Sequence, residues 1–223
     1  MNIFITGAGR GIGLALTQLA IEEKSTVFAL VRNLAKSDAL VSLQKKNPQQ
    51  LQILSGDVTD PQLPQMLKDF LGASTSLDCL INNAGILQRT DTREDFLESF
   101  RVNAIAPFHI TQALLPHLRR SSAPRVAHLT SAMGSIAENS SGGSVAYRAS
   151  KAALNMIHKN IALANPWLIS IALHPGWVQT EMGGSSAPVA PLESARSLWK
   201  MILNAEANST GRFYDFRGRE IPW

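Results

Sequence analysis

The chain has 223 residues, of which 45% are hydrophobic and 6% aromatic, and its formal net charge is +4. This composition excludes a disordered chain, and the single cysteine, Cys79, excludes an internal disulfide and a multi-cysteine metal site. The charge is too small for a nucleic-acid surface and favours weak attraction of an anionic ligand.

Short apolar runs alternate along the chain with longer segments of helical spacing. We predict strands at residues 2–6, 26–31, 51–55, 77–82, 125–131, 168–174 and 212–216. We predict helices at residues 13–23, 35–46, 61–71, 93–118, 145–164 and 191–204. This alternation is typical of an α/β fold: a doubly wound, mostly parallel, Rossmann-like sheet of about seven strands with helices on both faces. We expect one domain over residues 1–223.

The first predicted strand runs directly into the glycine-rich sequence TGAGRGIG. The spacing of Gly7, Gly9, Gly11 and Gly13 differs from G-x-G-x-x-G, because Ile12 stands where the third glycine would fall. A glycine-rich turn between a strand and a helix lets the backbone approach a pyrophosphate, which the amides at the helix N-terminus then bind. We therefore predict a dinucleotide site in this loop; a tight turn without a ligand is the alternative.

The residues after the second strand indicate which dinucleotide is bound. An NAD-binding sequence carries an acid about 20 residues beyond the glycines, but here Val31 takes that place and Arg32 and Asn33 follow. Arg10 lies within the glycine loop itself. A guanidinium pairs with a 2′-phosphate that a carboxylate would repel, so we predict NADP(H) rather than NAD(H). The alternative is that both arginines are solvated surface charges.

Further contacts to the cofactor are expected after the third strand. Asp57 can accept a hydrogen bond from the adenine amino group while Val58 flanks the ring. The alternative is a local role in helix capping, for which Thr59 or Asp60 is suited.

The second half of the chain carries side chains suited to proton transfer. Ser131 ends the fifth strand, Tyr147 and Lys151 share one face of helix 145–164, and Asn103 lies in the preceding helix. The phenol pKa is near 10 in a free tyrosine, and a nearby ammonium would lower it. We predict Tyr147 as general acid and base, Lys151 as the group that lowers its pKa and holds the nicotinamide ribose, and Ser131 as the group that polarises a carbonyl. A Tyr–Lys pair alone is more often an ordinary surface pairing.

Several segments together resemble the short-chain dehydrogenase/reductase family. They are TGAGRGIG, GDV, NNAG, RVNAIAPF, TSAMGSI, YRASK and HPGWVQTEM, and they cover essentially the full chain. The ending GRFYDFRGREIPW is similar to the sniffer-type carbonyl reductase and C-factor-like branch of that family.

The resemblance implies roles for further residues. The segment after the fourth strand would line the cofactor through Asn83, Ala84 and Gly85. Asn103 would support a water in a proton relay to Lys151. The segment after the sixth strand would contact the nicotinamide and its phosphate through Pro175, Gly176, Val178 and Thr180.

We therefore expect an NADPH-dependent oxidoreductase that reduces a ketone or aldehyde, or oxidises the alcohol. The alternative is a cell–cell signalling or dinucleotide-sensing regulatory protein, because C-factor-like relatives are linked to cell–cell signalling. The expected partner is a small carbonyl or alcohol substrate, and the family's habit of pairing long helices implies a homodimer or homotetramer. We expect no metal, no nucleic acid and no membrane partner. The opening MNIFITGAG has no basic leader, and we expect a cytoplasmic protein.

Overall fold

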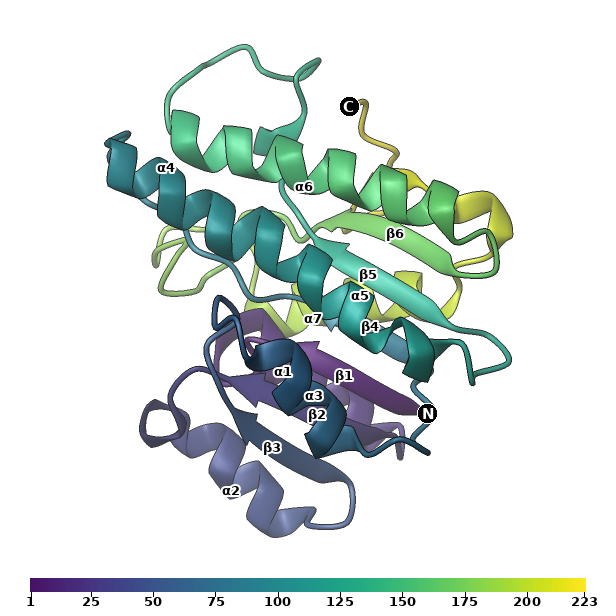
Figure 1. Ribbon diagram of the computed structural model, residues 1–223. Coiled ribbons are helices and arrows are strands. Elements are labelled where there is room, and N and C mark those ends of the chain that lie inside the picture. Colours follow the sequence, from purple (N-terminus) through teal and green to yellow (C-terminus); the bar gives the residue numbers. More distant parts are fainter.

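The computed structural model describes residues 1–223 and confirms the predicted fold class (Figure 1). Seven parallel strands form one sheet in the order β3-β2-β1-β4-β5-β6-β7. The strands are β1 (Asn2–Thr6), β2 (Thr26–Val31), β3 (Leu51–Ser55), β4 (Cys79–Asn82), β5 (Arg125–Leu129), β6 (Ile169–His174) and β7 (Arg212–Asp215). Strand order reverses between β1 and β4, and ligands bind in doubly wound sheets at the carboxyl ends beside such a reversal.

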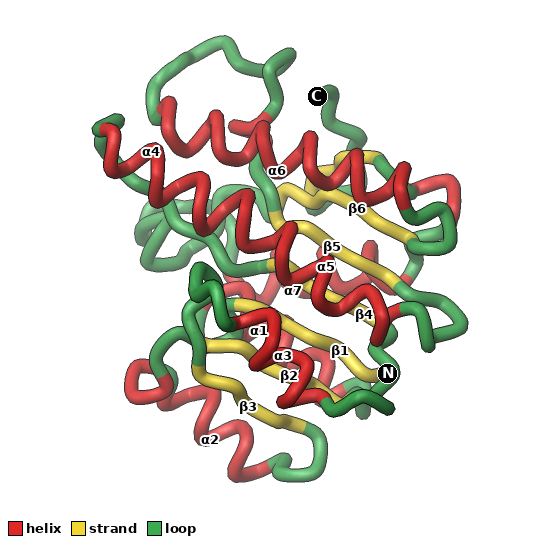
Figure 2. Tube along the Cα trace, in the orientation of Figure 1, coloured by secondary structure: helices red, strands yellow, loops and turns green.

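Helices lie before and behind the sheet, which forms the middle layer in Figure 2. They are α1 (Gly11–Glu22), α2 (Asp38–Lys46), α3 (Leu63–Leu71), α4 (Arg93–Phe100), α5 (Ala106–Leu118), α6 (Val145–Ala164) and α7 (Pro191–Leu203). One apolar core joins α1, α2 and α7 to one face of the sheet, and a second joins α3, α5 and α6 to the other. Helices α4 and α6 lie side by side (Figure 1).

The strands are apolar on both faces because helices cover both. In β1, Ile3 and Ile5 belong to the first core while Phe4, between them, belongs to the second, and all three are fully buried. This burial explains why the strands are continuous apolar runs rather than alternating ones.

The predicted helix 93–118 is interrupted in the structure. A π-helical segment, Arg101–Ile105, separates α4 from α5. Pro107 has no N–H to donate to the carbonyl of Asn103 four residues earlier, so regular α-helical bonding cannot pass through this point. Such π segments occur often at functional sites, and this one buries Asn103. None of the helices is both long enough and apolar enough to cross a bilayer.

Candidate active site

The glycine-rich loop joins β1 to α1 through a tight turn. Gly7 and Gly11 have φ of 67° and 54°, a region that favours glycine. A Cβ on Gly13 would lie 2.3 Å from the carbonyl oxygen of Gly7, so the strand and helix approach more closely than a side chain allows. No side chain caps the first turn of α1, which begins after Arg10. Its amide groups therefore fit the anionic pyrophosphate of a dinucleotide.

The other side of this loop contacts the chain that follows β2. A Cβ on Gly9 would lie 2.5 Å from Oγ of Ser37, and Ser37 in turn donates to the carbonyl of Asn33 at 2.9 Å. Ile12 packs against the first core. Ser37 was not predicted from the sequence, because a single serine in a polar connection carries no distinguishing signal.

The two arginines expected at the 2′-phosphate differ in their surroundings. Arg10 forms an exposed ion pair with Glu181, a residue that the sequence did not single out. Arg32 is exposed and makes no ion pair. Asn33 uses its Oδ1 to accept the N–H of Ala35 and so caps a short 3₁₀ turn. Of the two arginines, Arg32 is therefore the one whose guanidinium is free to bind a phosphate.

Asp57 is held in an ionised state at the end of β3. Partial burial opposes its ionisation, but hydrogen bonds from Thr59 and the nearby Arg32 and Arg101 outweigh burial and hold the pKa of this carboxyl below its usual range. Both bonds from Thr59 end on Oδ1. Val58 packs at the margin of the second core. The helix that follows begins later than predicted, at Leu63.

Ser131, Tyr147 and Lys151 come together where β5 ends. All three are buried, and the Ser131 side chain lies near enough to the Tyr147 hydroxyl to act on its pKa. Ser131 Oγ also accepts the N–H of Met133 at 3.2 Å, which caps a 3₁₀ turn at Ala132–Gly134. Lys151 Nζ donates to the carbonyl of Leu129 at 2.9 Å and lies 5.9 Å from the ring centroid of Tyr147.

The expectation that Lys151 lowers the phenol pKa is wrong for this structure. Burial raises the pKa of Tyr147, and the nearby Ser131 side chain offsets this only in part. Burial also lowers the pKa of Lys151 to about 8, so this side chain remains mostly charged at neutral pH and loses its charge as the pH rises through 8. The phenol therefore keeps its proton at neutral pH, which suits a general acid.

Asn103 is buried between the loop after β4 and helix α6, next to this group of side chains. Its amide accepts the N–H of Ile86 at 2.9 Å and donates to the carbonyl of Ile86 at 2.9 Å and to Ser150 Oγ at 3.0 Å. A Cβ on Gly85 would lie 3.2 Å from Asn103 Oδ1 and 3.5 Å from Lys151 Nζ, so the loop after β4 runs directly over both.

The loop after β4 is also bonded to the glycine loop. Thr6 Oγ1 accepts the N–H groups of Asn83 and Ala84, each at 3.0 Å. Asn83 Nδ2 donates to the carbonyls of Thr6 and Gly7 at 2.8 and 3.1 Å. Thr6 thus joins two predicted site segments, yet a threonine at the end of a strand is too common to have been predicted.

The segment after β6 divides into two parts. A Cβ on Gly11 would lie 3.1 Å from Cγ2 of Thr180, so Thr180 borders the glycine loop. Val178 is buried and forms a bridge with Val189. The Pro175–Gly176 turn has φ of 86° at the glycine, and the Phe216 ring packs directly against that glycine.

The sheet order and the glycine-rich loop after β1 are those of a Rossmann-like dinucleotide-binding protein. The short chain dehydrogenase family matches residues 1–189, and the chain belongs to that family. The chain is 43% identical over 155 residues to the C-signal protein of Myxococcus xanthus. The aligned region covers 66% of this chain and 93% of that protein.

Solved structures of carbonyl reductases share the fold over its whole length. The carbonyl reductase Sniffer of D. melanogaster has a TM-score of 0.94 at 29% identity, covering 100% of this chain and 99% of that one. The NADPH-bound carbonyl reductase from chicken fatty liver has a TM-score of 0.92 at 32% identity, covering 100% and 98%. The resemblance to the sniffer-type and C-factor-like branch is thereby confirmed.

Proposed function

We propose that this protein is an NADP(H)-dependent oxidoreductase that reduces a ketone or aldehyde, or oxidises the corresponding alcohol. The observation that carries the proposal is the group of three buried side chains, Ser131, Tyr147 and Lys151, at the carboxyl end of the sheet. The NADPH-bound carbonyl reductase from chicken, with the same fold, supports the choice of cofactor.

The cofactor would be held by the loops that follow β1 to β6. The glycine loop would take the pyrophosphate, Arg32 and Arg10 the 2′-phosphate, and Asp57 and Val58 the adenine. The remaining contacts would come from Asn33, Asn83, Ala84, Gly85, Tyr147, Lys151, Pro175, Gly176, Val178 and Thr180. A bound nicotinamide supplies the hydride for carbonyl reduction.

The side chains of this protein supply the proton and the orientation. In reduction, Ser131 donates a hydrogen bond to the substrate carbonyl oxygen and Tyr147 transfers its proton to the same oxygen. The phenol is protonated at neutral pH, as a proton donor must be, although its raised pKa makes it a weaker acid than a free tyrosine. Lys151 would return a proton to the phenol, and Asn103 would support a water that relays the proton to Lys151; both side chains lie beside the Cβ position of Gly85.

A carbonyl-substrate screen that follows NADPH absorbance tests this function. Tyr147→Phe keeps the ring and removes the proton, so turnover should fall roughly 10²–10⁴-fold while NADPH binding is retained. The chain has only one other tyrosine, Tyr214, and Tyr214→Phe is the matched control that should keep full turnover. Equal turnover in wild type and Tyr147→Phe would refute the mechanism.

A signalling role is the second candidate, and the identity to the C-signal protein favours it. Such a role would need the glycine loop and the arginines but not proton transfer by Tyr147. Replacing the chromosomal copy with Tyr147→Phe separates the two, because a phenotype that survives this change does not depend on turnover.

We also propose one domain over residues 1–223, a homodimer or homotetramer, and a cytoplasmic location.

A further inference from the structure

The last eight residues lie against the loop that carries Ser131. We call residues 216–223 the C-terminal segment and residues 131–144 the catalytic loop. The C-terminus lies at the same end of the molecule as the catalytic loop (Figure 2). The two are far apart in sequence, so their contact is a property of the fold alone.

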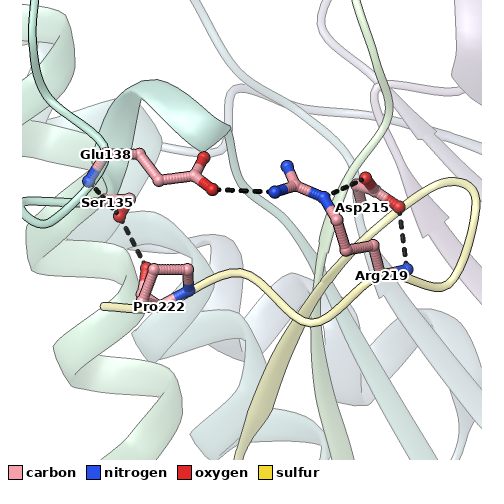
Figure 3. A network of polar contacts seen from close by, with 5 residues as sticks. All are labelled: Ser135, Glu138, Asp215, Arg219 and Pro222. Atoms are coloured by element: carbon pink, nitrogen blue, oxygen red, sulfur yellow. Dashed lines mark hydrogen bonds and ion pairs between the residues drawn. The ribbon is translucent and has the colours of Figure 1, made fainter.

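Backbone and hydroxyl groups make the first set of contacts. Ser135 Oγ donates to the carbonyl of Pro222 at 2.6 Å and accepts the N–H of Glu138 at 3.1 Å (Figure 3). The N–H of Ala137 donates to the carbonyl of Trp223 at 3.0 Å. Trp223 is held in turn by stacking on Phe213 of β7, with ring centroids 5.7 Å apart. The catalytic loop is therefore bonded to a segment fixed on the sheet.

Arg219 adds a charged connection between the same parts. Its Nη1 lies 3.0 Å from Glu138 Oε1 in the catalytic loop, and its Nε lies 3.1 Å from Asp215 Oδ2 at the end of β7 (Figure 3). Asp215 Oδ1 also accepts the N–H groups of Arg217 and Arg219. An exposed ion pair adds little to folding stability. This one, however, fixes the position of Glu138 relative to β7.

The C-terminal segment also contacts the turn expected at the nicotinamide. A Cβ on Gly176 would lie 2.9 Å from Cε1 of Phe216, so the aromatic ring lies flush against the Pro175–Gly176 turn. One short segment thus contacts both loops that border the reaction centre, after β5 and after β6.

The other half of the catalytic loop is anchored separately. Arg148 of α6 donates to the carbonyls of Gly142 and Gly143 and to Ser141 Oγ. Gly134, nearer Ser131, packs on the backbone of Lys151, where a Cβ would lie 2.8 Å from its carbonyl carbon. The stretch from Ser135 to Glu138 depends on the C-terminal segment through polar contacts. Ala132, next to Ser131, packs against a buried cluster that includes Ile221 of that segment.

We propose that the C-terminal segment positions Ser131 relative to the nicotinamide turn, with Arg219 and Glu138 as positioning residues. The proposal rests on the proposed carbonyl reduction. Ser131 must hold its hydroxyl within hydrogen-bonding distance of the carbonyl oxygen, while the Pro175–Gly176 turn, which we call the nicotinamide turn, positions the cofactor. Small misplacements of such groups reduce turnover strongly. Loosening the link between the two loops should therefore slow the chemical step and leave cofactor binding unchanged.

The test compares the Arg219–Glu138 pair with an exposed ion pair elsewhere on the molecule. Arg219→Gln and Glu138→Gln should each lower kcat roughly tenfold with NADPH affinity unchanged, and the double variant should lose no more than either single variant. Arg219→Lys should lose less. The control is Glu98→Gln, because the Arg101–Glu98 pair is also exposed but involves neither the catalytic loop nor the C-terminal segment. This control should keep wild-type kcat.

Amide hydrogen exchange gives a second readout that needs no turnover. Arg219→Gln should speed exchange in a peptide covering residues 132–140, and Glu98→Gln should not. Unchanged kcat in Arg219→Gln, an equal loss in Glu98→Gln, or unchanged exchange would overturn the proposal. If the wild-type protein reduces no carbonyl, the proposed function fails, and the exchange measurement still decides whether Arg219 orders the loop.

Discussion

At the scale of single residues, the two arginines proposed to bind the 2′-phosphate are not equivalent. Arg10 and Arg32 are both exposed, but Glu181 already neutralises Arg10. Arg32 has no carboxylate partner, and its charge acts on Asp57 beside it. A phosphate would therefore gain a full charge-assisted hydrogen bond from Arg32, whereas at Arg10 it must compete with Glu181.

Arg32→Gln should weaken NADPH binding by roughly 10–100-fold, since a hydrogen bond to a charged group contributes about 1.5–3 kcal/mol. NADH lacks the 2′-phosphate, so its dissociation constant should change little. Fluorescence titration with both cofactors measures the effect. Arg10→Gln serves as the comparison and should cost less. A parallel loss of NADH affinity would show that Arg32 does not read the phosphate.

Glu181→Gln should have the opposite effect on NADPH. The substitution frees the Arg10 guanidinium from its ion pair, so that it can bind the phosphate. We expect NADPH to bind roughly two- to fivefold more tightly, which corresponds to less than about 1 kcal/mol and fits the small free energy of an exposed ion pair. The gain should disappear in the Glu181→Gln/Arg10→Gln double variant; a gain that persists there would contradict the competition.

At the scale of elements, the glycine loop depends on close packing between β1 and α1. Gly13→Ala places a Cβ 2.3 Å from the Gly7 carbonyl oxygen, so the backbone of the loop must move. We expect a loss of about 1–3 kcal/mol in the free energy of unfolding and a large loss of NADPH affinity. Gly56→Ala is the control, since its Cβ would meet only the flexible ends of Leu63, Leu30 and Met66, at 3.3 to 3.7 Å. Denaturant unfolding and cofactor titration compare the two variants.

The elements themselves could largely be predicted from sequence. Strand and helix alternation follows from local apolar spacing, and strands that end together bring Gly7, Asn83, Ser131 and Gly176 to one edge of the sheet. The π-helical segment could not be predicted, because α- and π-turns share the same apolar spacing over a few residues. Its one local cause is Pro107, and a proline is tolerated at the start of many helices.

Polar contacts between distant segments were also beyond sequence reasoning. Thr6 with Asn83, and Ser135 with Pro222, are 77 and 87 residues apart, and no periodic pattern relates such pairs. The phenol pKa was misjudged for a similar reason. Four-residue spacing places Tyr147 and Lys151 on one face of α6, but the sequence does not show that both are buried and that Lys151 bonds the carbonyl of Leu129.

At the scale of the whole molecule, buried histidines make stability dependent on pH. Burial lowers the pKa of His158 and His174 from 6.5 to about 4, and that of His128 also falls well below its usual range. Below pH 6.5 the unfolded chain therefore binds protons that the folded protein does not. These buried neutral histidines make their full contribution to the free energy of unfolding above pH 6.5. That contribution is lost as the pH falls towards 4.

We expect the free energy of unfolding to fall between pH 7 and pH 5 by roughly 2 kcal/mol for each histidine whose pKa is about 4. Urea unfolding at several pH values measures this slope. His158→Gln should remove one such contribution and flatten the slope by a similar amount, whereas His109→Gln, at an exposed position, should leave it unchanged. Asp57 and Asp215, whose carboxyl pKa values lie below 3.8, lose their contribution only at lower pH and do not enter this window. A free energy of unfolding that stays constant from pH 7 to pH 5 would mean that His158 and His174 are open to protonation in the folded protein.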